Sequence, residues 1–194
     1  LFALVGSAVE AGVALVQLRE KLLRPRVLYE LTARCARLTR GTGTRLVVND
    51  RADIARAAGA DGVQLTSQSL DSSVVRRAFG RDFLVGVSAH SPEDARRAMR
   101  GGADFALLGP VFDTPSKRAY GPPLGLPAFA AAARALAPFP LLAIGGITLD
   151  NSADVLRAGA HGVAAIRLFG DASGLSEIVR ALEASADAEA KRSA

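Results

Sequence analysis

The sequence predicts an α/β fold, a (β/α)8 TIM barrel, and three observations support this fold class. Short, almost entirely apolar runs alternate with amphipathic segments, which is typical of parallel strands covered by helices and joined by right-handed crossovers. Three similar stretches, at 58–63, 101–106 and 158–163, each join a helix end to a strand, so the chain is built from a repeating unit. No Gly-x-Gly-x-x-Gly follows the first strand, which argues against a dinucleotide-binding open sheet.

The first expected element is a helix over Leu1–Gly12, because its apolar residues recur at helical spacing,. Strands and helices then alternate along the chain. The apolar runs predict strands at Ala14–Arg19, Arg45–Asn49, Gly62–Leu65, Phe83–Ser88, Phe105–Leu108, Pro140–Ile144 and Gly162–Ile166. The amphipathic segments predict helices at Val27–Leu38, Arg51–Ala58, Ser73–Phe79, Pro92–Arg100, Leu126–Leu136 and Leu149–Ala158.

A barrel of this type closes with eight strands, whereas the sequence predicts seven. Because the pattern opens on a helix, we expect the first strand to lie upstream of Leu1. At 194 residues the chain is long enough for one domain with a sizeable core,. We therefore assign residues 1–182 to a single barrel domain and residues 183–194 to a C-terminal tail.

The composition is that of an ordinary globular protein, with 49% hydrophobic and 22% charged residues,. The net charge of +5 is compatible with anionic ligands. The arginines, however, are spread over helical segments such as Ala95–Arg100, as on solvated helix faces. Aromatic residues make up 5% and do not alternate with basic residues, so we do not expect nucleic acid as a partner.

Cys35 is the only cysteine, which excludes a disulfide framework and a cysteine metal cluster. It lies in a predicted helix, and we interpret it as a small core residue. No apolar run is long enough to span a bilayer, and none has the flanks of a signal peptide,. The sequence therefore predicts a cytoplasmic protein without a membrane partner, and it is compatible with a homo-oligomer.

A long polar loop follows the predicted strand Phe105–Leu108. It carries Thr114, Ser116 and Lys117 and ends before the helix at Leu126. Loops of this length in a compact domain are usually functional, and hydroxyls beside a lysine suit an anionic ligand. A solvated surface loop is the alternative interpretation.

Barrel chemistry lies at the C-terminal ends of the strands, and the first two predicted strands end in polar residues. Gln17, Arg19 and Lys21 share one direction if the chain stays extended; alternatively, Lys21 has already turned into solvent. Asn49 and Asp50 supply an acceptor and a carboxylate that could hold Mg²⁺. Asp50 could equally cap the helix that follows.

The strand predicted at Phe83–Ser88 also ends in polar residues. Ser88 is a candidate ligand donor. His90 has no neighbours that mark a catalytic triad, and we interpret it as a structural turn residue. Ser91 occupies the N-cap position of the next helix.

The last two strand ends have the features of a phosphate site. Gly145 and Gly146 form a turn after the second-last strand, and in barrels of this kind the last two loops bind phosphate through backbone N–H groups. Arg167 would lie at the edge of that site. His161 occupies the position of Asp61 in the repeated stretch, and we interpret it as structural.

Five motifs, VQLREK, VVND, GVSAHS, LLGPVFDTPSK and AIGGITLDN, occur in this order and resemble those of the thiamine phosphate synthase family and its thiazole tautomerase relatives. The resemblance covers nearly the whole chain, from Leu1 towards Leu182. It implies a (β/α)8 barrel and a transferase of thiamine biosynthesis. That family joins a hydroxymethylpyrimidine diphosphate to a thiazole phosphate, giving thiamine phosphate and pyrophosphate.

The resemblance also implies roles for individual residues. Cations and a metal that stabilise the leaving diphosphate would lower the barrier to breaking its carbon–oxygen bond. The implied catalytic residues are Arg19, Lys21, Lys117 and Ser88, with Asp50 as the ligand of a Mg²⁺ cofactor. The implied substrate-binding residues are Gln17 and Asn49 on the diphosphate, Thr114, Gly145 and Gly146 on the thiazole phosphate, and Ile166 and Arg167 beside them.

Three positions depart from the family pattern. Ser69 replaces the Asp that is the second metal ligand in the stretch His-Leu-Gly-Gln-Glu-Asp, and a hydroxyl is a poor substitute for a carboxylate on a hard cation. Pro110 stands where the tautomerase relatives have a histidine, and Arg167 replaces a phosphate-loop serine. We expect a thiamine phosphate synthase. The alternatives are a thiazole tautomerase-like isomerase and a non-catalytic binder of phosphorylated thiamine precursors.

Overall fold

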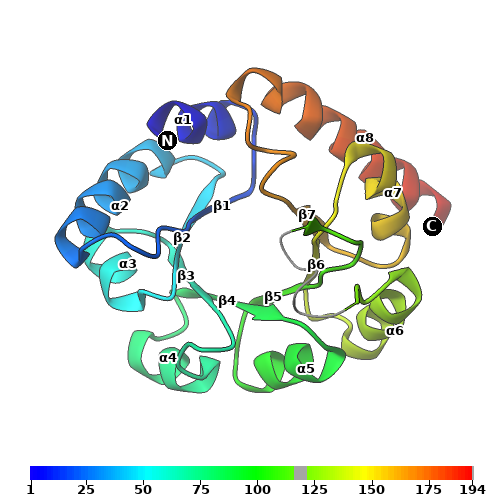
Figure 1. Cartoon of the computed structure of the whole chain (residues 1–194), viewed down its shortest axis with the longest axis horizontal. Helices are drawn as coiled ribbons and strands as arrows, with labels where there is room; N and C mark the ends of the chain where they lie inside the picture. Colours follow the sequence, from blue (N-terminus) through cyan, green and yellow to red (C-terminus); the bar gives the residue numbers. More distant parts are fainter. Residues whose placement is uncertain (116–121, 194) are drawn as a thin grey trace.

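Seven parallel strands curl around a common axis, and the helices lie outside them (Figure 1). The computed structural model describes residues 1–115 and 122–193. Within these residues each strand pairs in parallel with the next in the chain, in the order β1 to β7. The predicted barrel architecture of alternating strands and helices is therefore confirmed as a seven-stranded, curled parallel sheet.

The observed elements follow the predicted order, and most boundaries differ by one or two residues. The strands are β1 (Leu15–Leu18), β2 (Arg45–Asn49), β3 (Gly62–Leu65), β4 (Leu84–Ala89), β5 (Phe105–Leu108), β6 (Leu141–Ile144) and β7 (Gly162–Ala164). The helices are α1 (Phe2–Glu10), α2 (Pro25–Thr39), α3 (Ala52–Ala58), α4 (Ser72–Phe79), α5 (Pro92–Arg100), α6 (Leu126–Leu136), α7 (Leu149–Arg157) and α8 (Leu175–Ser193).

Helix α8 runs through most of the stretch assigned to a C-terminal tail. A short 3-10 helix, Ala172–Gly174, precedes it. Its apolar residues Leu175 and Val179 are buried, and the helix packs against α7 and α1 (Figure 1). Residues 183–193 therefore continue a helix that is anchored at its N-terminal end.

The repeated stretch, at 58–63, 101–106 and 158–163, links neighbouring strands through hydrogen bonds. Asp61 donates its N–H to the carbonyl of Leu46 (2.9 Å), and its carboxylate accepts the N–H of Leu46 (2.7 Å). Asp104 forms the same pair of bonds with Val85, at 2.8 and 2.7 Å. His161 keeps the backbone bond to the preceding strand. The repeat thus satisfies the first backbone groups of a strand, and the structural interpretation of His161 agrees with this geometry.

Arg76 joins two of these units at the N-terminal end of the barrel. Its guanidinium donates to the carbonyls of Gly80 (2.7 Å), Phe83 (2.7 Å) and Gly102 (2.9 Å) and to the carboxylate of Asp104 (2.6 Å). The side chain is only 17% exposed. A rigid fork of donors suits such a set of acceptors, and a lysine could not reach all of them.

Cys35 is fully buried in the hydrophobic core, as predicted. Burial raises the pKa of its thiol above the ordinary range,. Within the described residues, the helices are too short or too polar to cross a bilayer.

We predict that Arg76→Lys lowers the free energy of unfolding by about 2 kcal/mol, because a lysine cannot donate to all four acceptors that the guanidinium joins,. The matched control is Arg77→Lys, which changes an exposed arginine on the same helix and should leave stability unchanged. Urea unfolding followed by circular dichroism measures both variants. Equal stability of the two variants would contradict the structural role of Arg76.

We also predict that Cys35 in the native protein does not react with a water-soluble disulfide reagent, since the thiolate is both buried and disfavoured. In denaturing guanidinium the same thiol should react fully. Labelling measured by absorbance distinguishes the two states, and rapid labelling of the native protein would show that Cys35 is not a core residue.

Candidate active site

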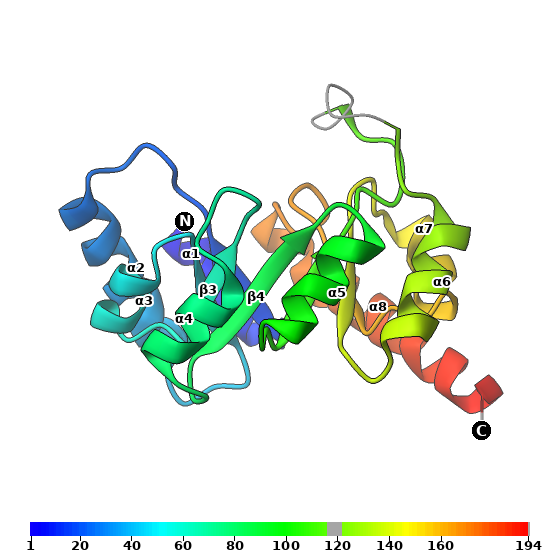
Figure 2. The same cartoon turned by 90° about the horizontal axis from the view of Figure 1, so that it is seen from below.

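The C-terminal ends of all seven strands open on one side of the barrel. Figure 2 shows the connections that follow β1 and β3, and the segment after β5, rising from this same edge. The parallel pairing requires this arrangement, because successive parallel strands all end at one edge. Residues predicted from separate strand ends therefore share one mouth.

Four polar side chains lie on successive strands just inside the mouth. Gln17 of β1 donates its amide to the side-chain oxygen of Asn49 on β2 (3.3 Å). Asn49 pairs in register with Gln64 on β3, and the Gln64 amide donates to the Ser88 hydroxyl on β4 (3.1 Å). We call Gln17, Asn49, Gln64 and Ser88 the polar row. It brings together three predicted residues and adds Gln64.

Gln64 is the residue that sequence reasoning missed. It is 1% exposed, in a strand whose other side chains are buried and apolar. Its Oε1 has no hydrogen-bond partner within the part of the chain that the structure describes. The available signal was an amide alone in the apolar run Gly62–Leu65, a position where packing by itself favours a hydrophobic residue.

The predicted cations after β1 lie at the mouth. Strand β1 ends at Leu18, one residue earlier than expected, and Arg19 and Lys21 follow it as exposed residues. The chain bends from Lys21 onward, so strand alternation does not extend to that residue. Neither side chain forms an ion pair with a described residue. Lys117 lies outside the described residues, and its meeting with these cations stays a prediction.

Asp50 has a left-handed backbone conformation, with φ of 64°, directly after β2. Its N–H donates to the carbonyl of Gln64 (2.9 Å), which fixes the backbone there. The N-cap of α3 is Arg51, with no side-chain cap bond, so the alternative that Asp50 caps this helix is wrong. Arg51 instead pairs with Asp53, at 2.9 and 2.6 Å, which lowers the pKa of Asp53.

Left-handed conformations are costly for residues other than glycine and concentrate at functional sites. The Asp50 side chain is exposed at the mouth and has no ion pair within the described residues. The carboxylate is therefore accessible from solvent at a backbone position that the bond to Gln64 fixes.

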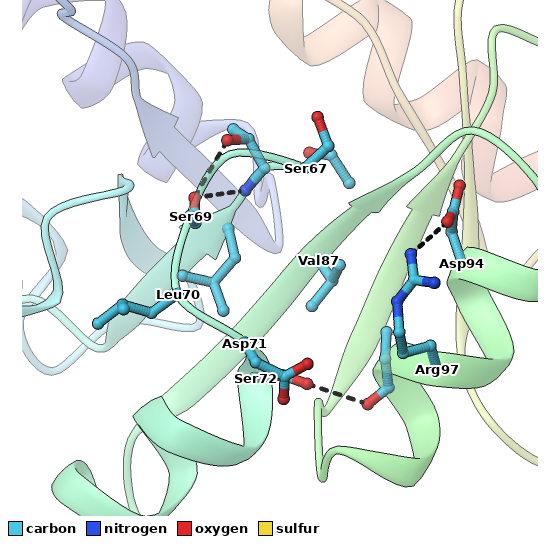
Figure 3. Close-up of a pocket in the computed structure, with 12 residues that line it drawn as sticks. Ser67, Ser69, Leu70, Asp71, Ser72, Val87, Asp94 and Arg97 are labelled. Atoms are coloured by element: carbon cyan, nitrogen blue, oxygen red, sulfur yellow. Dashed lines mark hydrogen bonds and ion pairs between the residues drawn. The ribbon is translucent and has the colours of Figure 1, made fainter.

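The Ser69 hydroxyl is used inside its own loop. It accepts the N–H of Thr66 (2.8 Å) and lies 3.1 Å from the Thr66 hydroxyl (Figure 3). Asp71 then caps α4 through the N–H of Ser73 (2.8 Å), and hydrogen bonds from the Ser73 side chain and backbone lower the pKa of Asp71. This loop therefore holds a turn and a helix start, and the Ser69 hydroxyl is hydrogen-bonded within the loop.

A small pocket of about 170 Å³ lies between this loop, β4 and α5 (Figure 3). Of its charged groups, Arg97 forms an ion pair with Asp94, and Asp71 accepts the N–H of Ser73. Ser72 donates to the carbonyl of Ala98 at the long distance of 3.5 Å. The pocket shares Ser88 with the polar row, and Ser69, Ser72, Asp71, Asp94 and Arg97 in its lining have protein partners.

The described residues contain no group of three or more acidic, histidine or cysteine side chains arranged to hold a metal ion. Asp50 is the one predicted ligand that the structure presents at the mouth. A single carboxylate fits Mg²⁺ only when substrate phosphates and water complete the coordination, which is the usual way this ion binds.

Gly145 and Gly146 lie on the opposite side of the mouth, with φ of 96° and 69°. A Cβ on Gly145 would come within 2.5 Å of Pro110, and one on Gly146 within 2.8 Å of the Asp113 carbonyl. The turn therefore packs closely against the segment after β5. Thr114 in that segment is only 7% exposed.

The predicted strand Gly162–Ile166 is too long, because β7 ends at Ala164. Ile166 and Arg167 lie in the turn that follows, and both are exposed. Ile166 is 79% exposed, so this apolar side chain is available to a ligand at the mouth.

The His90 side chain has a hydrogen-bond partner in the backbone, which agrees with the interpretation of His90 as a turn residue. Its Nδ1 lies 2.9 Å from the carbonyl of Gly109, across the end of β5. Ser91 caps α5 by accepting the N–H of Asp94 (3.1 Å), which confirms the predicted helix start.

Comparisons with known proteins agree on one family. A family model described as thiamine monophosphate synthase matches residues 1–169. The chain is 42% identical to a thiamine-phosphate synthase of Roseiflexus sp., over 93% of this chain and 76% of that protein. It is 41% identical to a thiamine-phosphate synthase of Moorella thermoacetica, over 92% of this chain and 85% of that protein.

Solved structures agree with this result. The chain is similar to thiamine phosphate pyrophosphorylase from Pyrococcus furiosus, with a TM-score of 0.84 and 30% identity over 94% of this chain and 89% of that one. A 3-hexulose-6-phosphate synthase, at 21% identity and a TM-score of 0.65, shares the fold alone over 94% and 93% of the two chains.

We predict that Asp50→Ala lowers the free energy of unfolding by about 1 kcal/mol, because alanine tolerates the left-handed conformation poorly. Asp50→Asn and Asp50→Gly should not be destabilised, since both residues accept positive φ. Urea unfolding of the three variants checks this order. A less stable glycine variant would mean that the Asp50 side chain, and not its conformation, supports the fold.

Proposed function

The chain belongs to the thiamine monophosphate synthase family, and on this premise we propose how its mouth performs the reaction. The enzyme is a transferase that condenses hydroxymethylpyrimidine diphosphate with thiazole phosphate to thiamine phosphate and pyrophosphate. The bond between the pyrimidine methylene and the diphosphate oxygen breaks, and its electron pair leaves with pyrophosphate. The thiazole nitrogen then supplies the electron pair of the new carbon–nitrogen bond.

Arg19 and Lys21 bind the diphosphate in this proposal. Both are exposed cations at the mouth without an ion pair among the described residues, so their charge is available to an anion. Negative charge grows on the pyrophosphate as the carbon–oxygen bond breaks, and fixed cations stabilise that charge. Lys117 is proposed as a third cation from the loop after β5.

In this proposal the polar row contacts the diphosphate substrate from the interior side of the mouth. Gln17 and Asn49 are half-buried and bonded to each other, so their amides are held in place for contacts with the diphosphate. Ser88 adds a hydroxyl on the neighbouring side of the mouth. Such positioning sets the methylene within reach of the thiazole nitrogen.

The opposite side of the mouth is proposed to hold the thiazole phosphate. The Gly145-Gly146 turn has no side chains that would keep a phosphate away from its backbone N–H groups, which suits a phosphate site. Thr114 and Arg167 would add a hydroxyl and a charge, and Ile166 would cover the apolar thiazole ring.

Asp50 is the residue that would hold Mg²⁺ together with the substrate diphosphate. When bound, Mg²⁺ supplies positive charge that neutralises the diphosphate as it departs. Ser69 is not part of this proposal, because its hydroxyl is bonded to Thr66. The cytoplasmic location and the oligomeric state stay predictions.

The observation that supports the proposal is a group of charges at one mouth that have no ion pair among the described residues, namely two cations after β1 and a carboxylate in a left-handed conformation after β2. A surface built only for solubility has no need of the left-handed Asp50.

We predict that the purified protein, given both precursors and MgCl₂, forms thiamine phosphate and an equal amount of pyrophosphate. Arg19→Ala, Lys21→Ala and Lys117→Ala should each reduce kcat/KM by roughly a hundredfold or more, as loss of a transition-state charge contact does. Arg81→Ala, which removes an exposed cation at the opposite end of the barrel, is the matched control and should retain activity. Asp50→Asn should raise the MgCl₂ concentration needed for half-maximal rate.

The same assay separates the alternatives. Tight binding of the precursors without product would identify a binder of phosphorylated thiamine precursors. Isomerisation of the thiazole phosphate alone would identify a tautomerase-like enzyme. Either result would contradict the proposed synthase.

A further inference from the structure

We infer that Gln64 is a positioning residue of this reaction: its carboxamide donates to the Ser88 hydroxyl and so directs the hydroxyl proton towards the departing diphosphate. The inference rests on the proposed function, and it concerns a residue that the motifs of the mouth do not include. It follows from the buried position of Gln64, from its partner and from the space around it.

The contact between the two residues is direct. Nε2 of Gln64 lies 3.1 Å from Oγ of Ser88. Gln64 is 1% exposed, whereas Ser88 is half-buried and also lines the pocket beside the mouth. The pair therefore links a fixed interior group to a hydroxyl that a ligand can reach.

The Gln64 side chain is held tightly in place. A Cβ on Gly86, its register partner on β4, would lie 2.3 Å from Gln64 Oε1 and 2.3 Å from the Phe105 ring. Only glycine at position 86 leaves room for both groups. The Gln64 carboxamide and the Phe105 ring thus both use the space beside Gly86, which a side chain at position 86 would fill.

The donor role determines what Ser88 can do. A serine hydroxyl has one proton to donate and can accept hydrogen bonds at its oxygen. When Gln64 N–H occupies the oxygen, the proton remains available for an acceptor outside the pair, and a diphosphate oxygen is a strong one. A Ser88 that donated to Gln64 instead would have no proton for the substrate.

Folding alone does not explain a glutamine at this position. Its Oε1 is buried without a partner among the described residues, and an unpaired buried carbonyl costs free energy that an apolar side chain would avoid. A role in orienting Ser88 accounts for an amide donor at this buried position.

The test is a double-mutant cycle with Gln64→Met, Ser88→Ala and the double variant. Methionine has nearly the same shape as glutamine but offers no N–H donor. Two readouts are compared, kcat/KM for the pyrimidine diphosphate and the Kd of inorganic pyrophosphate in MgCl₂. Gln68→Met makes the same change at an exposed glutamine and should behave as the wild type.

Gln64→Met should lower kcat/KM and weaken pyrophosphate binding by about tenfold, because the Ser88 hydroxyl then loses its directed hydrogen bond to a charged phosphate oxygen. The double variant should be no worse than Ser88→Ala alone, because Gln64 acts through the serine. Gln64→His, which keeps a ring N–H, should recover part of the loss. Melting temperatures of all variants verify that they fold.

Two results would overturn the inference. If the losses of the two single variants multiply in the double variant, Gln64 does not act through Ser88. If Gln64→Met binds pyrophosphate as tightly as the wild type or more tightly, the serine proton was never directed by the amide. A wild type that forms no thiamine phosphate would instead refute the proposed function, and the pyrophosphate-binding cycle would still decide the role of Gln64.

Discussion

Parallel pairing of successive strands is the constraint on which the rest of this structure depends. Each strand bonds to the next in chain order, so every strand delivers its last residues to the same mouth. At the other end, the carboxylates of Asp61 and Asp104 accept the first N–H groups of neighbouring strands, and Arg76 donates to Asp104. The two ends of the barrel therefore differ in role. The N-terminal end stabilises the strand pairing, and the C-terminal end carries the polar and charged side chains of the candidate site.

The mouth has two halves that differ in character. The half built from β1 to β4 carries amides, a hydroxyl, exposed cations and the left-handed Asp50. The half built from β5 to β7 carries close-packed glycines and an exposed Ile166. This division suits a reaction of two phosphorylated partners, one of which must lose a diphosphate while the other offers a nitrogen.

The sequence was most informative where local chemistry decides the structure. Apolar runs located β2, β3 and β5 to the residue, and Ser91 was correctly predicted as a helix cap because capping depends on neighbours in the chain,. Cys35 was correctly placed in the core for a similar reason. Prediction from the sequence failed where the structure depends on contacts between strands that are distant in the chain. The end of β7, the conformation of Asp50 and the role of Gln64 depend on residues brought near by pairing, and no local pattern contains them.

A crystal structure of the protein with pyrophosphate and MgCl₂ would test most directly whether the charges at the mouth meet around the diphosphate. We expect pyrophosphate in the mouth, with Arg19, Lys21 and Lys117 around it, Asp50 towards the metal ion and the Ser88 hydroxyl on a phosphate oxygen. Pyrophosphate bound elsewhere, or these three cations directed away from one another around an empty mouth, would contradict this expectation.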